Sequence, residues 1–459
     1  MKNFDYTYWS SPVEGQTFYN FSPNTLWDKY LSFTGTVWQE ELGSSIMKPG
    51  IGYIIRVPKP NAVYPNGKDY WTGSDYTQQV EFIGRPNNGN ITSSQYMEKD
   101  KYYLIGNPYP SAIHADAFLY SNVNNRNILG GTVYFWTHNT AIKKVNSRLA
   151  YVSDDYASYN LTGGVASAKS DPNHDVSGVD NGKKPTGYIA AGQSFFTNAE
   201  DGSGYVEFTN TMRYGGTNNT HFYKPGKTSK SAEMEKHRLW LNMTNSEGAF
   251  KQTLVGYIEG ATNAYDKIFD GLSFDGNSYI DFYSINAATN LTIQGRALPF
   301  TDTDVVPLGY RSAIAGDFTI AIDEADGNLA AQRVYLEDKQ TGTINELTAG
   351  NYTFTTKAGT FNNRFVLRYT NKTLGTGDFE TTDDAVSVVI QNKTVTVNST
   401  VENIDKVLIY DISGKQLYKK EEVNNLQLII QNLPFAQQVL LVKVVLDNGY
   451  QTTKKVIFK

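Results

Sequence analysis

The sequence predicts an all-β protein made of three consecutive β-sandwich-type domains, the last a small Ig-like sandwich of about seven strands. Short segments in which apolar and polar residues alternate recur along the chain, whereas helical periodicity is scarce. The composition, with 32 Tyr, 23 Phe and 39 Gly, favours strands and turns over helices. A length of 459 residues suits about three domains.

The first domain is expected at residues 1–223, an aromatic-rich β region that holds five of the six tryptophans. Its strand-like segments include Gly52–Val57, Tyr102–Ile105 and Thr132–Trp136, and Ser111–Leu119 is the best short helix, with a serine near its start. Most of the aromatic rings are expected to fill a large β core. Exposed Trp and Tyr rings would instead offer a platform on which sugar faces stack.

The polar residues 224–236 are expected to form a linker, after which a second β-sandwich domain spans residues 237–370. Arg238–Met243 opens this domain with an alternating pattern, and Arg333–Asp338 and Arg364–Tyr369 have the composition of later strands. Asp-Gly pairs between the strands favour tight turns. The region has the size of a single sandwich.

A second linker is expected at residues 371–380, before a last domain at residues 381–459 whose strands are the clearest in the chain. Lys406–Asp411 leads into a turn at Ile412–Lys415, and the segment Leu440–Leu446 alternates strictly between apolar positions. About seven short strands in some 80 residues are typical of a small Ig-like sandwich.

Composition and motifs argue against several classes of function. The net charge is -5 and no long block of like charge occurs, so nucleic acid is not an expected partner. The most apolar run, Val439–Leu446, contains Lys443 and falls short of the roughly 20 residues of a transmembrane span. Cysteine is absent, and neither a complete phosphate-binding loop nor a nucleophile elbow occurs. No catalytic residue is therefore assigned, and we expect a protein that is not an enzyme.

One loop has a pattern that suits calcium. Asp171, Asn173 and Asp175 follow the spacing with which calcium loops begin, and Asp180 supplies a further oxygen ligand. The sixth position of the pattern is not glycine, however, and the twelfth is not glutamate. Two interpretations stay open, a Ca²⁺ site formed by these four residues and a plain loop rich in Asp and Asn with no cofactor.

The C-terminal strands resemble a known family. The ordered blocks Val407–Leu417, Leu426–Leu433, Leu441–Val444, Asp447–Gly449 and Lys454–Ile457 resemble the type A C-terminal sorting domain of proteins that the type IX secretion system of Bacteroidota exports. The resemblance covers about residues 377–459. One departure is that members often carry Gly-x-Tyr before the penultimate pair of strands, where this chain has Gln-Gln-Val.

The resemblance implies export to the cell surface or the medium. Its implied partners are the outer-membrane translocon, the shuttle barrel protein of that translocon and a sortase-like peptidase that cleaves near the start of the domain. The residues that match the motif positions, and that the resemblance implies for translocon recognition, are Asp411, Gly414, Lys415, Lys443, Gly449, Lys454 and Lys455. The two glycines suit turns. The lysines suit electrostatic contact with a partner, or else they keep edge strands soluble.

Segments of the first two regions are similar to those of large flavobacterial surface proteins. These segments include Ile105–Ser111, Leu291–Leu298 and Gly359–Thr370. We therefore expect a C-terminal fragment of a secreted or cell-surface cargo protein, whose upstream β domains act as adhesin, spacer or binding modules. The alternative is a carbohydrate-binding accessory region of a secreted polysaccharide-degrading enzyme, with a surface glycan as its partner.

Overall fold

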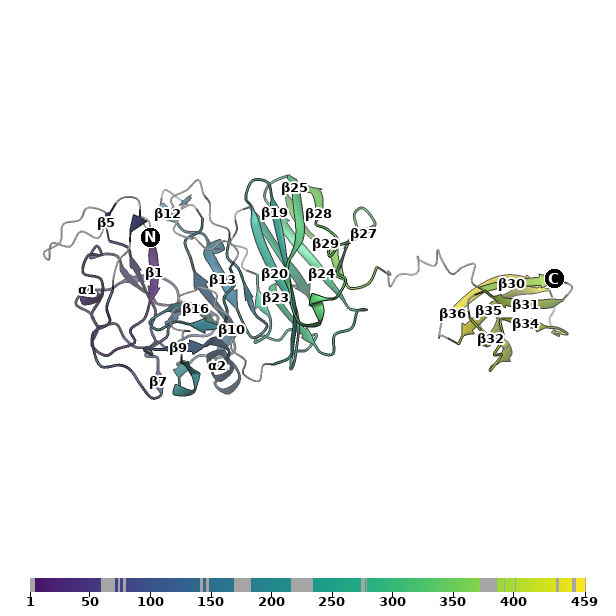
Figure 1. Ribbon diagram of the computed structural model, residues 1–459, viewed down its shortest axis with the longest axis horizontal. Coiled ribbons are helices and arrows are strands. Elements are labelled where there is room, and N and C mark those ends of the chain that lie inside the picture. Colours follow the sequence, from purple (N-terminus) through teal and green to yellow (C-terminus); the bar gives the residue numbers. More distant parts are fainter. Residues whose placement is uncertain are drawn as a thin grey trace. The chain divides into compact units, whose positions relative to one another are not determined.

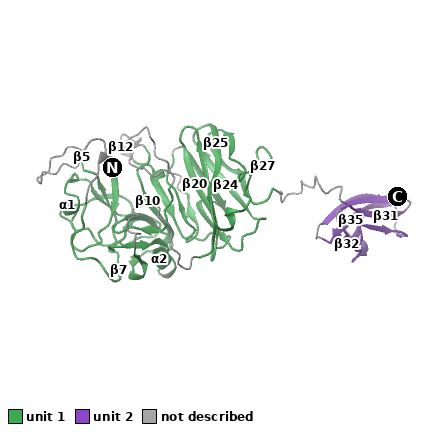
Figure 2. Cartoon of the chain, in the orientation of Figure 1, with its two compact units in different colours: residues 1–371 green, residues 372–459 purple. Residues whose placement is uncertain are grey.

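The computed structural model describes residues 5–58, 71–72, 75–76, 80–140, 143–145, 148–168, 183–215, 234–273, 277, 279–371, 386–391, 393–400, 402–434, 437–447 and 451–458. Strands dominate throughout these ranges (Figure 1), which confirms the predicted all-β class. The chain divides into two compact units, unit 1 at residues 1–371 and unit 2 at residues 372–459 (Figure 2). No helix in the described ranges has both the length and the apolar character needed to cross a membrane.

The N-terminal part of unit 1 contains two main antiparallel sheets. The first has four strands in the order β1 (Tyr6–Trp9), β4 (Tyr53–Arg56), β2 (Tyr30–Phe33) and β3 (Trp38–Glu40). The second has five strands in the order β14 (Gly164–Val165), β13 (Tyr156–Tyr159), β10 (Leu129–Trp136), β16 (Ser194–Ala199) and β8 (Lys101–Gly106). Four small sheets accompany them, namely β15 (Tyr188–Ile189) with β9 (Ala112–His114) and β18 (Arg213–Tyr214), β17 (Glu207–Phe208) with β7 (Ile91–Thr92), β11 (Lys143–Val145) with β12 (Arg148–Ala150), and β5 (Trp71–Thr72) with β6 (Asp75–Tyr76).

Side chains from the two main sheets interlock. Tyr8 and Ile54 from the four-stranded sheet pack against Leu104, Tyr134 and Phe196 from the five-stranded sheet. The opposite face of the five-stranded sheet packs on helix α2 (Ala115–Tyr120), which lies beside β10 (Figure 1). The central strands of the five-stranded sheet are thus buried on both faces, which explains why they alternate so little in sequence.

Among the described residues of this region, two short α-helices occur, α1 (Phe18–Phe21) and α2. The helix predicted at Ser111–Leu119 begins later than expected, because residues 112–114 pair as strand β9 with β15 and β18. His114 caps the helix in place of the serine, since its Nδ1 atom accepts a hydrogen bond of 3.2 Å from the backbone N–H of Asp116.

The second part of unit 1 is one continuous sheet that curls around a core. The strand order is β27 (Thr343–Glu346), β26 (Tyr335–Asp338), β29 (Gly359–Arg368), β24 (Val305–Ser312), β22 (Ile280–Asn286), β23 (Thr289–Ala297), β20 (Phe250–Ile258), β19 (Lys236–Asn245), β25 (Gly316–Ala325) and β28 (Tyr352–Thr356), with β21 (Gly271–Leu272) paired to β23. Leu241 on β19, Phe282 on β22 and Leu367 on β29 share one hydrophobic cluster. The two halves of the sheet therefore face one another as a sandwich does.

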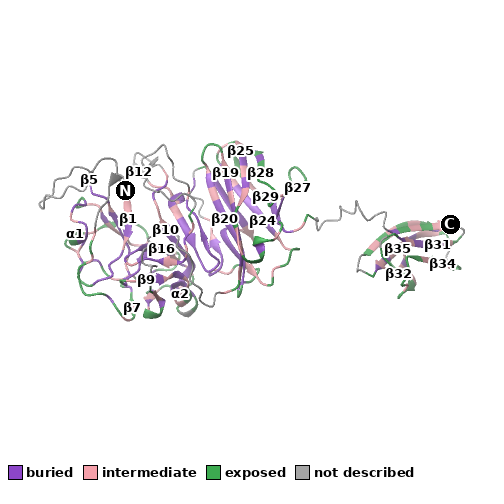
Figure 3. Ribbon diagram, in the orientation of Figure 1, coloured by how far each residue is buried: buried purple, intermediate pink, exposed green. Residues whose placement is uncertain are grey.

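The two parts of unit 1 share an interior. Trp240, Leu254 and Ile293 on the sandwich pack against Val165, and the indole N–H of Trp240 donates a 2.8 Å hydrogen bond to the backbone oxygen of Gly164. Strand β20 is buried along most of its length (Figure 3), because one face looks into the sandwich and the other covers this interface. The regions predicted as residues 1–223 and 237–370 thus lie within one compact unit. Of the linker predicted at 224–236, the structure describes residues 234–236, and β19 begins at residue 236.

The described residues of unit 2 form seven strands in two antiparallel sheets. The three-stranded sheet has the order β30 (Val386–Gln391), β31 (Thr394–Ser399) and β34 (Gln427–Ile430). The four-stranded sheet has the order β33 (Gln416–Lys420), β32 (Ile404–Asp411), β35 (Gln438–Leu446) and β36 (Gln451–Phe458). Both sheets contribute to one core, which includes Val395, Val397, Val407, Ile409 and Val442. The predicted alternation over residues 440–446 is observed, with the even-numbered side chains buried.

Candidate functional site

The turn between β32 and β33 contains three of the residues predicted for translocon recognition, Asp411, Gly414 and Lys415. The Oδ1 atom of Asp411 accepts hydrogen bonds from the backbone N–H of Ser413 at 2.9 Å, from the Ser413 hydroxyl at 2.6 Å and from the backbone N–H of Lys415 at 3.0 Å. The Ser413 hydrogen bond is the main cause that lowers the pKa of Asp411 below its ordinary value. Gly414 adopts a φ of 85°, in the left-handed region that glycine tolerates best. Asp411 and Gly414 therefore shape this turn.

The predicted lysines do not share one face of the sheet. Lys454 and Lys455 are neighbours on β36, so their side chains point to opposite sides. Lys454 lies on the side of the buried Phe458, whereas Lys455 is exposed on the other side. Lys443 on β35 also points away from the core, because its neighbours Val442 and Val444 are buried. The structure thus brings Lys443 and Lys455 together and separates them from Lys454.

We call the surface that carries Lys443 and Lys455 the outer face. It consists of the side chains of the four-stranded sheet that point away from the core: Lys406, Leu408, Tyr410, Lys419, Val439, Leu441, Lys443, Val445, Gln451, Thr453, Lys455 and Ile457. The register places Leu408 opposite Lys443 and Tyr410 opposite Leu441. The next strand places Lys455 opposite Leu441 and Ile457 opposite Val439. Apolar and basic side chains are therefore interleaved.

Some of the lysines on the outer face pair with a carboxylate and others do not. Glu421 pairs with Lys406 at 2.6 Å and with Lys419 at 2.8 Å, and these two contacts lower the pKa of Glu421 below its ordinary value. Within the part of unit 2 that the structure describes, no carboxylate forms an ion pair with Lys443 or Lys455. The centre of the face is therefore positively charged and partly apolar.

Other predicted site residues lie outside the described residues. Gly449, which lies between β35 and β36 in the sequence, is one of them. The four calcium candidates Asp171, Asn173, Asp175 and Asp180 are the others. Elsewhere, the described ranges contain no group of three or more His, Asp and Glu side chains arranged to hold a metal ion.

The tryptophans of unit 1 divide between interior and surface. Trp240 is buried, whereas Trp27 is 77% exposed and Trp38 is 40% exposed. The ring of Trp38 contacts Phe33 edge-on, with 5.0 Å between ring centroids. Exposed indole rings of this kind can stack on the apolar face of a sugar.

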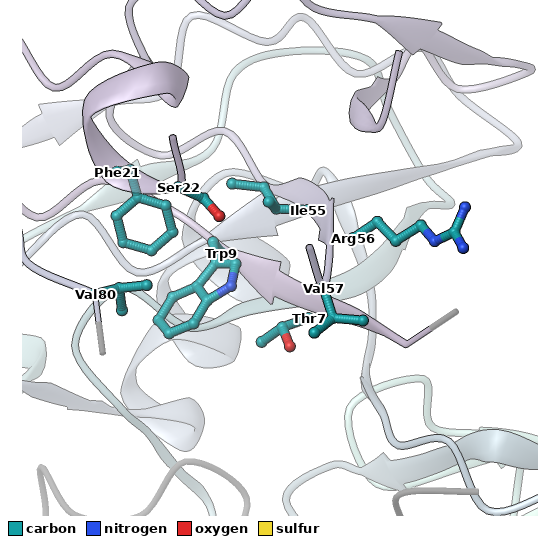
Figure 4. A pocket seen from close by; sticks show the side chains of 8 residues that line it. All are labelled: Thr7, Trp9, Phe21, Ser22, Ile55, Arg56, Val57 and Val80. Carbon is teal, nitrogen blue, oxygen red and sulfur yellow. The ribbon is translucent and has the colours of Figure 1, made fainter. Parts of the chain in front are cut away.

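A small cavity lies between β1, β4 and α1 (Figure 4). It encloses about 100 Å³ and is lined by Thr7, Trp9, Phe21, Ser22, Ile55, Arg56, Val57 and Val80. The guanidinium of Arg56 extends away from the ring of Trp9 (Figure 4). Typical ligand pockets have volumes of about 300 Å³ or more, so this cavity suits no ligand the size of a sugar ring.

A buried polar cluster, absent from the sequence-based predictions, lies at the start of β1 and the end of β10. His138 Nδ1 is 2.5 Å from Asp5 Oδ1, and both side chains are almost fully buried. Asp155 Oδ1 accepts hydrogen bonds from the backbone N–H groups of Asn139 at 3.0 Å and Thr140 at 2.9 Å. These residues are separated by up to 150 positions in sequence, so it is the packing of β1 against β10 and the pairing of β10 with β13 that bring them together.

Burial and the contacts within this cluster change the pKa values of Asp155 and His138. Desolvation is the main cause that raises the pKa of Asp155 to about 7. Burial alone would lower the pKa of His138, but the hydrogen bond and the charge of Asp5 outweigh it and raise the pKa above its ordinary value. His138 Nε2 and Asp155 Oδ2 have no hydrogen-bond partner among the described residues.

Comparison with known proteins gives two family matches. Residues 1–369 match a family model described as a domain of unknown function (DUF8693), and residues 374–458 match a second model described as a domain of unknown function (DUF8694). No curated protein matches the chain. The gap between the two matched ranges coincides with the boundary between unit 1 and unit 2.

Proposed function

The chain belongs to the family described as a domain of unknown function (DUF8693), and from its C-terminal unit we propose that it is a secreted or cell-surface cargo protein of the type IX secretion system. In this proposal, residues 381–459 are the sorting signal, and the β domains of unit 1 are the exported adhesin, spacer or binding module. The proposed partners are the outer-membrane translocon, its shuttle barrel protein and a sortase-like peptidase.

The observation that carries the proposal is the self-contained fold of unit 2. Its seven strands enclose their own core, and the buried residues of that core all come from positions 386–458. A signal that is read through its folded shape has to fold whatever cargo precedes it, and a separate hydrophobic core satisfies that requirement. The resemblance of the blocks between Val407 and Ile457 to type A sorting domains supports the same function.

Deletion of residues 377–459 in the native host tests the proposal. We expect the truncated protein to disappear from the cell surface and the medium and to accumulate inside the cell. Unit 1 ends at residue 371, so the deletion leaves its core intact, and a thermal melt of the truncated protein checks this. Export of the folded truncated protein at the level of the full chain would refute the proposal.

A second candidate function is carbohydrate binding by unit 1, as in an accessory region of a polysaccharide-degrading enzyme. The exposed indole rings of Trp27 and Trp38 favour it. A glycan array probed with residues 1–371 tests this candidate. Binding that is lost in Trp27→Ala or Trp38→Ala, but kept in the control Tyr120→Ala, would support it; Tyr120 is 55% exposed on α2. An array without any bound glycan would leave unit 1 as an adhesin for other surfaces or a spacer.

A further inference from the structure

The two exposed faces of unit 2 differ in chemistry. The outward side chains of the three-stranded sheet are mostly polar and include Ser387, Thr396, Asn398 and Gln427, although Val389 and Ile429 are apolar and about half exposed. On the outer face, the outward positions of the two central strands, β32 and β35, are mostly apolar: Leu408, Tyr410, Val439, Leu441 and Val445. An antiparallel sheet with one face in water usually has polar side chains on that face. The apolar centre of the outer face therefore departs from what a solitary domain requires.

The charge on the outer face indicates what would cover it. Lys443 and Lys455 are diagonal neighbours on adjacent strands, which places their Cβ atoms roughly 7 Å apart. The carboxylate of Glu421 is already engaged with Lys406 and Lys419 at the β33 side of the sheet. The ammonium groups of Lys443 and Lys455 therefore remain available to carboxylates on another molecule, while Leu408, opposite Lys443, and Leu441, opposite Lys455, offer apolar contact beside them.

Edge protection does not account for both lysines. Lysine often occurs on edge strands because it discourages pairing with other chains, and Lys455 lies on the edge strand β36. Lys443, however, lies on β35, which is paired on one side with β32 and on the other with β36. A lysine in the middle of a sheet protects no edge.

An anionic membrane is also a poor fit. Recognition of anionic lipid headgroups typically uses clusters of about four to eight basic side chains. The outer face has four lysines, and Glu421 neutralises two of them in part. A flat surface with apolar residues at its centre and two free lysines better matches the anatomy of a protein–protein interface.

We propose that the outer face of unit 2 is the docking surface for a protein partner that presents carboxylates around an apolar patch, with Lys443 and Lys455 forming the charged contacts and Leu408 and Leu441 the apolar ones. This inference rests on the proposed export function and specifies which surface of the sorting domain its receptor reads.

The test uses the full chain in the native host and compares three proteins. The first carries Lys443→Glu and Lys455→Glu. The second, a matched control, carries Lys393→Glu and Lys420→Glu, which change the net charge equally; Lys393 lies in the turn between β30 and β31, and Lys420 lies opposite the inward-facing Val407. The third carries Lys443→Arg and Lys455→Arg, which keep the charge. Melting of each purified chain verifies that unit 2 is folded.

We expect the exported fraction to fall roughly tenfold or more in the first protein, which corresponds to about 1.4 kcal/mol of lost contact energy, and to be unchanged in the control and the arginine variant. Unchanged export of the first protein would overturn the docking surface, and so would an equal loss in the control. If deletion of residues 377–459 leaves export intact, the export function and the docking surface fail together; if only the deletion blocks export, the docking surface alone fails.

Cosedimentation of the purified chain with phosphatidylglycerol vesicles tests the other kind of partner. Cosedimentation that is abolished in the first protein would replace the protein partner by a lipid surface.

Discussion

The core of unit 1 contains many aromatic rings, whereas the core of unit 2 is almost wholly aliphatic. In unit 1, Tyr8, Tyr134 and Phe196 form the contact between two sheets, and Tyr310 stacks on Phe361 in the sandwich. In unit 2, Phe458 is the one aromatic ring among the buried core residues that the structure describes. Large rings cover more area but bring polar atoms inside, so a tyrosine-rich core has to pair those atoms as well.

The two units also differ in buried charge. Unit 1 encloses the ion pair between Arg364 and Asp338 and the cluster of Asp5, His138 and Asp155. In the described part of unit 2, Ser399 is the one buried polar side chain. Unit 1 is therefore expected to depend on pH and on individual polar contacts, whereas unit 2 depends on the packing of small apolar side chains.

The largest effect is expected from Asp338→Ala in unit 1. Asp338 accepts hydrogen bonds from Arg364, at 2.8 Å from Nη2, and from the Tyr352 hydroxyl at 2.9 Å. Its removal leaves a buried guanidinium without a counter-charge, which costs about 3–5 kcal/mol. Differential scanning calorimetry should show the unit 1 transition at a lower temperature and the unit 2 transition unchanged. The control Glu14→Ala, which removes the exposed partner of Arg85, should move neither transition; equal melting of the two variants would contradict the role of the buried pair.

In unit 2, the adjacent residues Leu440 and Leu441 sharpen the comparison. Leu440 is fully buried in the core, whereas Leu441 points to the outer face. Leu440→Ala removes buried methyl groups and should cost about 3 kcal/mol, a large part of the stability of so small a domain. Leu441→Ala should cost roughly 1 kcal/mol or less. Denaturant unfolding of the full chain distinguishes the two variants, because the midpoint of the unit 2 transition should shift further for Leu440→Ala than for Leu441→Ala. Equal effects of the two substitutions would mean that the outer face is as tightly packed as the core.

The buried titratable groups of unit 1 predict that its stability depends on pH. The folded-state pKa of Asp155 is raised to about 7, and that of Asp270 is also raised to about 7, in both cases mainly by burial. A raised pKa contributes stability that is fully present below the ordinary value near 3.8 and is lost as the pH rises through about 7. The raised pKa of His138 acts in the same direction, since the protonated form is favoured by folding.

Unit 1 should therefore melt at a lower temperature at about pH 8 than at about pH 5, with roughly 2–3 kcal/mol attributable to each of the two carboxyl groups. Calorimetry at a series of pH values measures this shift, and unit 2 in the same chain is the internal control. The double variant Asp155→Asn with Asp270→Asn should flatten the profile of unit 1. A profile that keeps its slope in this variant would show that other groups dominate the titration.

The sequence predicts unit 2 better than unit 1, and the reason is physical. Each sheet of unit 2 has one face in the core and one in water, so apolar and outward-facing side chains alternate clearly over residues 440–446. The Ser-Gly pair at 413–414 in addition indicates a turn. The strands of unit 1 are often buried on both faces, which erases the alternation. The packing of β1 against β10 and the pairing of β10 with β13, which assemble Asp5, His138 and Asp155, depend on contacts between distant segments and leave no local signal. The opposite directions of Lys454 and Lys455, in contrast, follow from strand periodicity alone.

The smallest expected effect is that of Gly414→Ala in the β32–β33 turn. An alanine Cβ at this position would meet no atom within 4 Å, so the substitution creates no clash. The φ of 85° is nevertheless unfavourable for any residue with a Cβ, which costs about 1 kcal/mol. The control Gly350→Ala, at a position with equally open space and no positive φ, should be neutral or slightly stabilising. A measurable loss in the unit 2 transition for Gly414→Ala, with no loss in the unit 1 transition for Gly350→Ala, would assign this glycine to turn geometry. If Gly414→Ala reduces export while unit 2 keeps its stability, the turn itself contacts the receptor, and the docking surface extends from the outer face to the end of the sheet.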